Sequence, residues 1–337
     1  MHCPSISELP PPPPGVHGWP WTEGSLPVAD ARPDGSPWPR ISIVTPSYNQ
    51  GYFIEETLRS VLLQGYPSLE FMVLDGGSVD GTVEIIRKYA PWLAYWASEP
   101  DDGQTSAIRK GLHRSSGEIF QWINSDDVLL PGTLGKVGSN FGNEAIAGGI
   151  LVGDKIQSAA PRWNTCLSAR DFLTDKATFC QPGLWLPCDR AKEVDLDESF
   201  HFVFDWIYAC RYFLRYSKVS YLNEPLAFFR LHHDSKTVSD SRSFWQESFR
   251  ARKLISASIS EPELKAMIDD VTKRAIWHRF LQRKVAVKGD KRLSVACLIT
   301  HLALRKPGIR LDRYSLGALR RVIFRKSGVE MSHAPNI

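Results

Sequence analysis

Between residues 40 and 123 the sequence alternates short apolar runs with segments whose apolar residues recur at helical spacing, and this alternation constrains the fold more than any other feature. The apolar runs predict strands over residues 41–45, 70–74, 93–97 and 119–123. The spaced segments predict helices over residues 54–62, 82–89 and 106–115. Because helices between strands imply crossover connections, the pattern predicts an α/β fold with a mainly parallel sheet.

Polar residues follow three of the four predicted strands. The segments are Thr45-Pro46-Ser47-Tyr48-Asn49, Asp75-Gly76-Gly77-Ser78 and Asn124-Ser125-Asp126-Asp127. Ligands of such sheets bind where the strands end, so the three segments should converge on one edge. Adjacent carboxylates at a buried strand end repel each other and are costly to desolvate, so Asp126 and Asp127 suggest a nearby cation. The alternative is that one of them caps a helix.

The glycine-rich segment after the second strand argues against two common nucleotide-binding folds. Residues 75–81, Asp-Gly-Gly-Ser-Val-Asp-Gly, do not form the Gly-x-Gly-x-x-Gly fingerprint of dinucleotide-binding domains, and the sequence contains no Walker A motif. Asp75 places a carboxylate where those folds bring bare backbone against pyrophosphate. A carboxylate there suits hydrogen bonding to a base or a ribose instead.

Charge is unevenly distributed along the 337 residues. The formal net charge is +4, but residues 241–337 hold 21 Lys and Arg against 8 Asp and Glu, and the rest of the chain is correspondingly acidic. A basic C-terminal region predicts an anionic partner: a membrane surface, a phosphorylated acceptor or nucleic acid. No recognised nucleic-acid motif accompanies the charge, so nucleic acid is not expected as a partner.

The first 39 residues form a separate segment by composition. They contain 11 of the 23 prolines, including the run from Pro10 to Pro14. Such a segment cannot bury enough apolar surface to fold alone, which predicts a flexible or polyproline II lead. The alternatives are a ligand for another domain and a segment that wraps around the body with Trp19, Trp21 and Trp38. The predicted organisation is residues 1–39, an α/β domain over 40–240 and a helical basic region over 241–337.

The cysteines and the apolar runs predict a cytoplasmic location. The six cysteines show no Cys-x-x-Cys pair and no zinc-like spacing, which is typical of reduced thiols, and we expect neither a disulfide nor a zinc site. The sequence shows no secretory signal and no run of about eighteen apolar residues.

Four motifs in this order resemble those of glycosyltransferase family 2, in the bacterial branch that decorates polysaccharides and lipid-linked glycans. They are residues 45–49, residues 74–82, Ser98-Glu99-Pro100-Asp101-Asp102-Gly103-Gln104 and residues 124–127. The resemblance covers residues 40–237. It implies the GT-A fold, a mixed, mostly parallel sheet flanked by helices, and an inverting hexosyltransferase-type enzyme that uses a nucleotide-diphosphate sugar and Mg²⁺ or Mn²⁺.

The resemblance also implies which residues bind the donor. Thr45, Pro46 and Tyr48 would line the nucleotide pocket, Asp75 would bind the base, and Asp102, Gly103 and Gln104 would close over the nucleotide-sugar.

The metal-binding Asp-x-Asp motif of the family falls on Asn124-Ser125-Asp126, with Asp127 beside it. Asn124 is a neutral oxygen ligand at best, so Asp126 and Asp127 would hold the metal and the ribose between them, in an order that the sequence leaves open. His232, in an Arg-x-His segment, could approach the metal or the diphosphate, and Arg230 could offset phosphate charge. His232 could equally be structural.

The acceptor side of the resemblance rests on residues farther along the chain. Gln181, Pro182 and Trp185 lie in the loop that would face the acceptor, where Trp185 could stack on a sugar or belong to the core. Asp205, an acid among aromatic residues, would take the proton of the acceptor hydroxyl, and otherwise would cap a helix. Glu198 is the substitute candidate for the base.

Beyond residue 237 the resemblance ends, and helices are predicted over residues 244–259, 263–284, 292–304 and 314–326. The last is basic and amphipathic, which favours either a membrane surface or a face packed on the α/β domain. The prediction as a whole is a cytoplasmic or peripheral membrane enzyme that transfers a sugar to a glycan or lipid-linked acceptor. The resemblance favours UDP as the nucleotide of the donor. Two rival hypotheses remain. One is a nucleotidyltransferase, which shares the α/β architecture and acid-metal chemistry but normally shows a Gly-rich basic N-terminal signature that is absent here. The other is a degenerate family member that binds nucleotide-sugar or acts as a scaffold.

Overall fold

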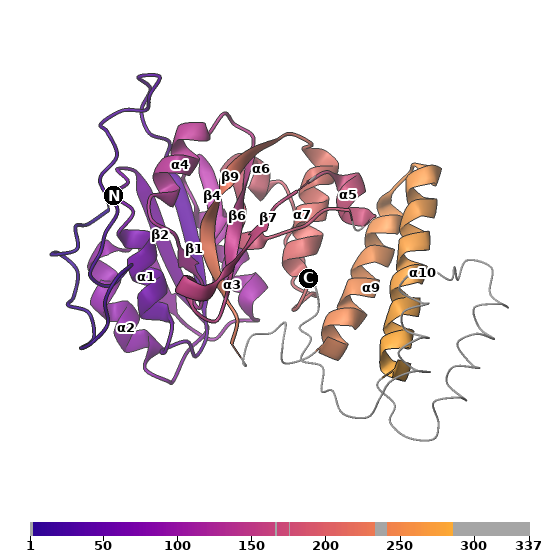
Figure 1. The fold of residues 1–337 in the computed structure, drawn as a ribbon, viewed down its shortest axis with the longest axis horizontal. Coiled ribbons are helices and arrows are strands. Elements are labelled where there is room, and N and C mark those ends of the chain that lie inside the picture. The colour runs from indigo at the N-terminus through magenta and orange to yellow at the C-terminus, as the bar shows by residue number, and fades with distance from the viewer. Residues whose placement is uncertain (1–2, 166, 175, 233–240, 286–337) are drawn as a thin grey trace. The chain divides into compact units, whose positions relative to one another are not determined.

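The computed structural model describes residues 3–165, 167–174, 176–232 and 241–285 (Figure 1). The chain divides into two compact units, one formed by residues 1–172 and 176–247 and the other by residues 173–175 and 248–337. The first unit contains the sheet and the segments singled out above.

The sheet of the first unit has nine strands in the order β3-β2-β1-β4-β8-β6-β9-β5, with β7 paired to β6. Strands β1 to β4 pair in parallel, as the alternating pattern predicts, whereas β8 enters antiparallel between β4 and β6. The strands are β1 Ile41–Ser47, β2 Leu69–Asp75, β3 Tyr95–Ser98, β4 Ile119–Trp122, β5 Val128–Leu129, β6 Ala145–Gly153, β7 Ala160–Trp163, β8 Leu184–Pro187 and β9 Val219–Arg230.

The predicted helices of the first unit form within two residues of their expected bounds. The α-helices are α1 Ile54–Leu62, α2 Thr82–Tyr89, α3 Gln104–Arg114, α4 Thr133–Asn140, α5 Ala169–Leu173, α6 Cys188–Lys192 and α7 Phe204–Arg215. Short 3-10 turns occupy Ala90–Trp92, Ile156–Ser158 and Gln181–Gly183. The mixed α/β sheet with flanking helices is the GT-A architecture that the resemblance implies.

Strand β1 is the centre of the parallel part of the sheet, and all seven of its residues are buried. Ile43 packs in the core cluster with Leu58 of α1. Its neighbour Val44 points to the opposite face, where α3 approaches so closely that a Cβ on Gly111 would lie 2.5 Å from a Val44 methyl. Helices α1 and α3 therefore cover opposite faces of β1, and both begin near its carboxyl end.

The expectation that Pro46 would stop the first strand is wrong. Strand β1 continues through Pro46, which pairs with Leu74, to Ser47. The Val44 carbonyl accepts the Ile123 N–H on the β4 side, and two residues later the backbone nitrogen of Pro46 points the same way. Proline has no N–H to continue this ladder, and the pairing of β1 with β4 ends at Val44 and Trp122.

The N-terminal segment from residue 3 to residue 39 has no helix or strand, yet it packs along the first unit as the wrapping alternative predicts. The backbone N–H groups of Cys3 and Ser25 donate to the carbonyls of Tyr66 and Leu63, each at 2.9 Å. Leu9 joins the hydrophobic core. The polar backbone of an irregular segment is thereby satisfied, and the segment becomes part of the fold.

A fully buried arginine of α1, Arg59, fastens this segment. Its guanidinium donates to three carbonyls, those of Pro10 at 2.7 Å, Pro20 at 3.0 Å and Trp21 at 2.9 Å. It also donates to the Tyr89 hydroxyl at 3.1 Å, and this hydroxyl donates in turn to a carboxylate oxygen of Glu55. We call this arrangement the Arg59 clasp.

Two helices follow the sheet, α9 Ser241–Ser258 and α10 Pro262–Val285, close to two of the four helices predicted for the C-terminal region. The other two predictions, residues 292–304 and 314–326, lie outside the described residues. In the part of the chain that the structure describes, no helix combines the length and apolar character needed to cross a membrane.

Candidate active site

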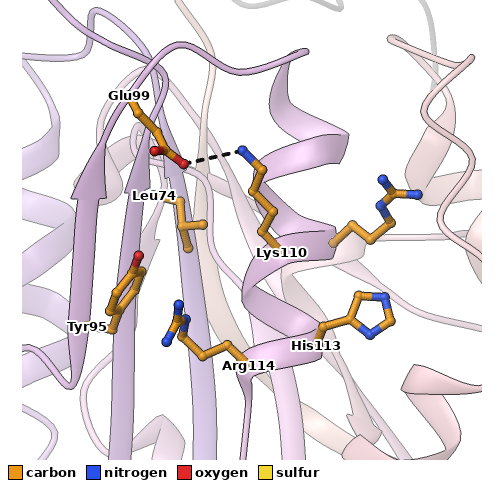
Figure 2. A pocket seen from close by; sticks show the side chains of 7 residues that line it. Leu74, Tyr95, Glu99, Lys110, His113 and Arg114 are labelled. Carbon is orange, nitrogen blue, oxygen red and sulfur yellow. Dashed lines mark ion pairs between the residues drawn. The ribbon is translucent and has the colours of Figure 1, made fainter.

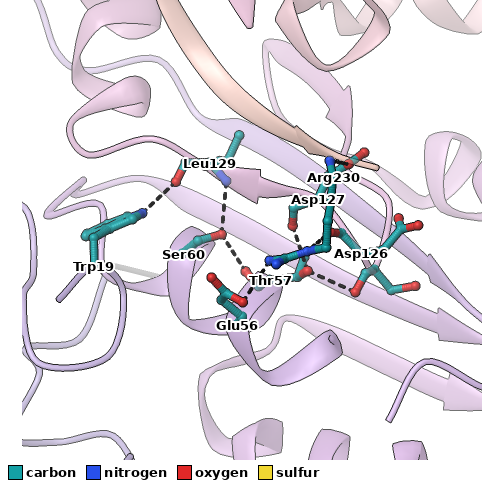
Figure 3. Close-up of polar contacts among 9 residues, drawn as sticks. Trp19, Glu56, Thr57, Ser60, Asp126, Asp127, Leu129 and Arg230 are labelled. Carbon is teal, nitrogen blue, oxygen red and sulfur yellow. Dashed lines mark hydrogen bonds and ion pairs between the residues drawn. The ribbon is translucent and has the colours of Figure 1, made fainter. Parts of the chain in front are cut away.

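The backbone that follows β4 leaves the sheet and is held by a row of polar side chains on α1. The Thr57 hydroxyl lies 3.0 Å from the Ser125 carbonyl oxygen and 2.7 Å from that of Asp127. The Ser60 hydroxyl accepts the Leu129 N–H at 3.1 Å (Figure 3), and the Gln64 amide donates to the Leu130 carbonyl at 3.0 Å. Thr57 and Ser60 share one face of α1, and Gln64 lies just beyond the end of the helix, so α1 and the turn after it support the segment that carries the two acids.

Asp127 is buried and faces inward. One carboxylate oxygen accepts the Arg230 backbone N–H at 3.1 Å and the other accepts the Asn124 side-chain amide at 3.1 Å. Burial, reinforced by the charge of Asp126, raises the pKa of Asp127 well above its ordinary value. Neither oxygen is turned toward solvent, which fits an anchoring carboxylate better than an exchangeable ligand.

Asp126 has the opposite character, although it is the next residue in the sequence. Its side chain is 22% exposed, and one carboxylate oxygen lies 3.0 Å from Nε2 of His232. The His232 ring packs on the Phe53 ring, with centroids 4.6 Å apart. Asp126 and His232 are 106 positions apart in sequence, so the fold brings together a carboxylate and an imidazole that the sequence analysis identified separately.

Arg230, at the end of β9, connects this pair to α1. Its Nη2 pairs with the Glu56 carboxylate at 2.7 Å, and its Nε donates to the Asp126 carbonyl at 3.0 Å (Figure 3). The guanidinium lies over the rings of Phe53 and Phe228, 5.2 and 5.3 Å from their centroids. We call Asn124, Asp126, Asp127, Arg230 and His232 the carboxylate corner.

Glu56 belongs to the corner in space but was not a sequence candidate. It lies in the first turn of α1, where an acid is ordinary because it complements the helix dipole. Burial raises the pKa of Glu56, and the charge of Arg230 opposes that effect. The only sequence signal was a pair of adjacent acids, Glu55 and Glu56, of which one would have to turn inward.

Of the three residues predicted to close over the nucleotide-sugar, Gln104 reaches the corner. Its amide nitrogen donates to Oδ1 of Asn124 at 2.7 Å. Gly103, which precedes α3, has a φ of +105°, a conformation that favours glycine. Asp102 is exposed on the loop, and Asp101 beside it accepts the Gly103 N–H at 2.8 Å.

The predicted nucleotide side contains buried hydroxyls at the end of β1. Among the described residues, the hydroxyls of Thr45 and Ser47 have no hydrogen-bond partner, and both side chains are buried. Tyr48 follows and is 63% exposed. Asp75 is buried and accepts hydrogen bonds from Ser78 and Ser98, among others in its own loop, so its carboxylate braces that loop as well as facing the strand ends.

Trp185 does not fit the acceptor role proposed from sequence. It lies in β8 and is fully buried in the core cluster, so its ring has no face available to stack on a sugar. Gln181 is also buried, and its amide donates to the Trp122 carbonyl at 2.9 Å. Pro182, buried in the same 3-10 turn, offers its carbonyl to the Gln121 amide at 3.2 Å. The segment ties β8 to β4 instead of presenting side chains outward.

Asp205 lies in the first turn of α7, whose N-cap is Val203, so the helix-cap alternative is not what the structure shows. One carboxylate oxygen accepts the next backbone N–H, that of Trp206, at 2.7 Å. The ring of the preceding Phe204 lies 6.2 Å from Trp122 at the end of β4. This contact brings the start of α7 toward the strand ends.

Glu198, the substitute candidate for the base, is occupied by another partner. Its carboxylate pairs with Nε of Arg109 on α3 at 2.8 Å. The loop between Glu198 and α7 is further held by Glu247, which accepts the Phe202 N–H at 2.7 Å.

A hollow of about 650 Å³ lies beside α3, away from the carboxylate corner (Figure 2). Its basic side chains are engaged within the domain: Lys110 pairs with Glu99 at 3.5 Å, and the Arg114 guanidinium stacks 3.8 Å over the Tyr95 ring. Paired cations give no reason to assign a ligand to this hollow, and we place the candidate site at the corner.

The comparisons with known proteins decide the family. Residues 42–184 match the model of "Glycosyl transferase family 2". The matched region, residues 42–184, belongs to this family. An uncharacterized glycosyltransferase of Mycobacterium tuberculosis is 37% identical over 90 residues, covering 26% of this chain and 34% of that protein. The putative teichuronic acid biosynthesis glycosyltransferase TuaG of Bacillus subtilis is 36% identical over 94 residues, covering 26% and 36%. The chain thus spans about a third of the length of the curated relatives it matches.

Solved structures of other proteins share the fold at low sequence identity. Residues 1–349 of Staphylococcus aureus TarS, in complex with UDP-GlcNAc, superpose with a TM-score of 0.57 at 15% identity, covering 84% of this chain and 89% of that one. The mannosyltransferase PcManGT of Pyrobaculum calidifontis, in complex with GDP-Man and Mn²⁺, superposes with a TM-score of 0.53 at 18% identity, covering 86% and 91%. These likenesses confirm the predicted GT-A fold.

The residues of the corner suit the divalent metal that the family implies. Asp126 and His232 offer an oxygen and a nitrogen in contact with each other and partly accessible. Mg²⁺ and Mn²⁺ sites on phosphate substrates commonly need only one or two protein ligands, because the substrate supplies others. The described residues contain no cluster of three or more His, Cys, Asp or Glu side chains that could hold a metal ion.

Proposed function

We propose that this protein is an inverting glycosyltransferase that moves a sugar from a UDP-sugar to a hydroxyl group of a glycan or lipid-linked acceptor. The observation that carries the proposal is the Asp126–His232 pair next to Arg230, at the strand end where the family binds its donor. TarS has been solved with UDP and with UDP-GlcNAc, which supports a UDP-sugar as donor.

On this proposal the corner handles the charge of the leaving group. Asp126 and His232 would hold the divalent cation, whose charge offsets that of the departing nucleoside diphosphate. Arg230 is fixed by Glu56 and by the Asp126 carbonyl, so its positive charge is already positioned at the corner before substrate arrives. Asp127 holds the backbone of Arg230 and would not contact the metal.

Asp205 is the proposed base. The acceptor oxygen forms the new bond to the anomeric carbon while its proton passes to the Asp205 carboxylate. The bond between that carbon and the diphosphate oxygen breaks, and its electron pair leaves with the nucleoside diphosphate. Attack opposite to the leaving group inverts the configuration, and a general base contributes about 100-fold or more to such a step.

The test uses the full chain with Mn²⁺, UDP-sugars and GDP-mannose, and measures release of the nucleoside diphosphate with and without sugar acceptors. Asp205→Asn should lower turnover about 100-fold. Asp189→Asn is the matched control: Asp189 lies exposed in the first turn of α6 and accepts the next N–H at 2.7 Å, as Asp205 does. The control should keep the parent rate.

The same experiment decides between the enzyme and a nucleotide-sugar-binding scaffold. Calorimetric binding of a UDP-sugar without release of UDP, across all acceptors, would favour the scaffold. Release that persists unchanged in Asp205→Asn would remove Asp205 from the mechanism, and Glu198→Gln would then be the next variant to measure.

A further inference from the structure

The first acid of the family's Asp-x-Asp motif is replaced by an amide, Asn124, and both ends of that amide are used inside the protein. Oδ1 accepts the Gln104 amide N–H at 2.7 Å, and Nδ2 donates to Oδ2 of Asp127 at 3.1 Å. The other oxygen of Asp127 accepts the backbone N–H of Arg230 at 3.1 Å. A continuous chain of hydrogen bonds therefore joins the loop before α3 to the end of β9.

The polarity of this chain requires an amide at one position and a carboxylate at the other. The Gln104 amide and the Arg230 backbone N–H are both donors. The atom of Asn124 that faces Gln104 and the atom of Asp127 that faces Arg230 must therefore both be acceptors. The bond inside the pair then needs one donor, which a carboxylate cannot supply. One amide and one carboxylate satisfy all three bonds.

We infer that Asn124 is a positioning residue that couples the donor-side loop to Asp127 and Arg230, and is not a ligand of the metal. This inference rests on the proposed function and concerns the arrangement of the donor site within it. With Oδ1 committed to Gln104, Asp126 is left as the acid of the motif that is open to the metal, and His232 as its companion.

The arrangement predicts that the pair can be exchanged. In Asn124→Asp/Asp127→Asn, the new acid accepts from Gln104 and from the new amide, whose oxygen accepts from Arg230. All three hydrogen bonds and the net charge are preserved. Each single variant breaks this pattern: Asn124→Asp sets two carboxylates against each other, and Asp127→Asn leaves two amides with one acceptor too few.

The test compares the melting temperature of the full chain and its affinity for Mn²⁺ in the presence of UDP across the parent, both single variants and the exchange. Each single variant should lower the melting temperature by about 4 °C. The exchange should restore the parent value and leave Mn²⁺ affinity within about twofold. Asn140→Asp, at an exposed amide that donates to the Lys136 carbonyl, controls for adding an acid at a surface site.

If position 124 were a metal ligand, the exchange would give a different result, because it also restores the Asp-x-Asp motif at constant net charge. If position 124 coordinates the metal, the exchange should bind Mn²⁺ about tenfold more tightly or more, which would overturn the inference. The inference would also be overturned if the exchange did not recover the melting temperature that each single variant loses.

Gln104→Leu provides a second measurement that keeps both Asn124 and Asp127 and removes only the donor to Oδ1 of Asn124. It should weaken UDP binding about tenfold, the loss of one well-placed hydrogen bond, with Mn²⁺ affinity unchanged. Unchanged UDP binding would contradict the coupling. None of these readouts requires turnover, so a protein that transfers no sugar but tolerates the exchange would refute the proposed function and leave the role of Asn124 standing.

Discussion

The Arg59 clasp and the carboxylate corner each contain a largely buried arginine, and the two arginines are satisfied in different ways. Arg59 is 0% exposed and gives its hydrogen bonds to neutral acceptors, three carbonyls and one hydroxyl. Arg230 is 13% exposed at its side chain and pairs with the carboxylate of Glu56, beside Asp126 and Asp127. The Arg59 guanidinium binds backbone carbonyls, whereas the Arg230 guanidinium pairs with a carboxylate.

The difference shows that burial of a charged residue does not by itself mark a binding site. In the clasp, every acceptor belongs to the fold and nothing is left to bind a ligand. At the corner, Glu56 pairs with Arg230 and Asp127 accepts two N–H donors, which leaves Asp126 as the more accessible carboxylate. A divalent cation bound at Asp126 would offset the charge of that carboxylate.

The largest predicted effect is on stability, at the clasp. Arg59→Ala removes four hydrogen bonds and leaves three carbonyls of the N-terminal segment without their donor, so we expect a loss of about 4 kcal/mol in the free energy of unfolding. Urea denaturation measures it. Arg87→Ala, at an exposed arginine of α2 that lies 3.9 Å from Glu84, should change stability by less than about 0.5 kcal/mol. Equal effects of the two variants would contradict the structural role of the clasp.

The corresponding change at the corner should act mainly on activity. Arg230→Met removes the guanidinium while keeping an apolar chain between the rings of Phe53 and Phe228. We expect kcat/KM to fall about 100-fold, because a positioned charge at the leaving group is lost. Stability should fall by only about 1–2 kcal/mol, since Glu56 can take up a proton when its cation is gone.

The measurement is steady-state kinetics with UDP-sugar, paired with urea denaturation of the same preparation. Glu56→Gln/Arg230→Met removes both charges and should recover part of the stability without recovering activity. A variant at Arg230 that unfolds like Arg59→Ala while retaining its rate would erase the distinction between the two regions.

Sequence reasoning predicted the part of the fold that depends on local pattern. Strands β1 to β4 and helices α1 to α3 follow from periodicity and turn residues, and Asp126, Arg230 and His232 follow from motifs; the structure brings these three side chains together. The antiparallel entry of β8 between β4 and β6 could not be predicted, because strand order after a break in the alternation depends on tertiary packing.

The roles of α1 were missed for a physical reason. Thr57 and Arg59 lie in a helix whose pattern marks polar positions as exposed, and arginine is rarely fully buried. Their partners, the backbone after β4 and the carbonyls of the N-terminal segment, are distant in sequence and carry no side-chain signature. For Trp185 the error was the opposite: a role in binding was predicted for a residue that is buried in the core. A motif match does not tell whether a side chain faces the ligand or the core.

A smaller effect, on the pH dependence of stability, is expected at the clasp. Burial raises the pKa of Tyr89 above its ordinary value of about 10. Above pH 10 the unfolded chain releases this proton while the folded chain keeps it, so the stability that Tyr89 contributes is complete below pH 10 and is lost as pH rises toward the raised pKa. Tyr89→Phe should therefore flatten the fall of stability between pH 9 and pH 11, apart from a constant loss of about 1 kcal/mol.

The control for this variant is the parent protein titrated over the same range, because other buried tyrosines, Tyr66 and Tyr208, also have raised pKa values and contribute to the parent slope. The difference between the two curves isolates Tyr89. A difference that does not change with pH would mean that the Tyr89 hydroxyl ionises as readily in the folded chain as in the unfolded one.

The smallest predicted effect tests whether the clasp region and the corner are linked. The Trp19 indole donates to the Leu129 carbonyl at 2.8 Å, two residues beyond Asp127 (Figure 3), while the Trp38 indole makes the same kind of bond to Ala29 at 2.7 Å within the N-terminal segment. Trp19→Phe and Trp38→Phe should each cost about 1 kcal/mol of stability. Only Trp19→Phe should also lower kcat/KM, about threefold, because only its bond braces the segment that carries the acids. If both variants leave kcat/KM unchanged, the N-terminal segment stabilises the domain without setting the geometry of the corner, and the two arginines work independently.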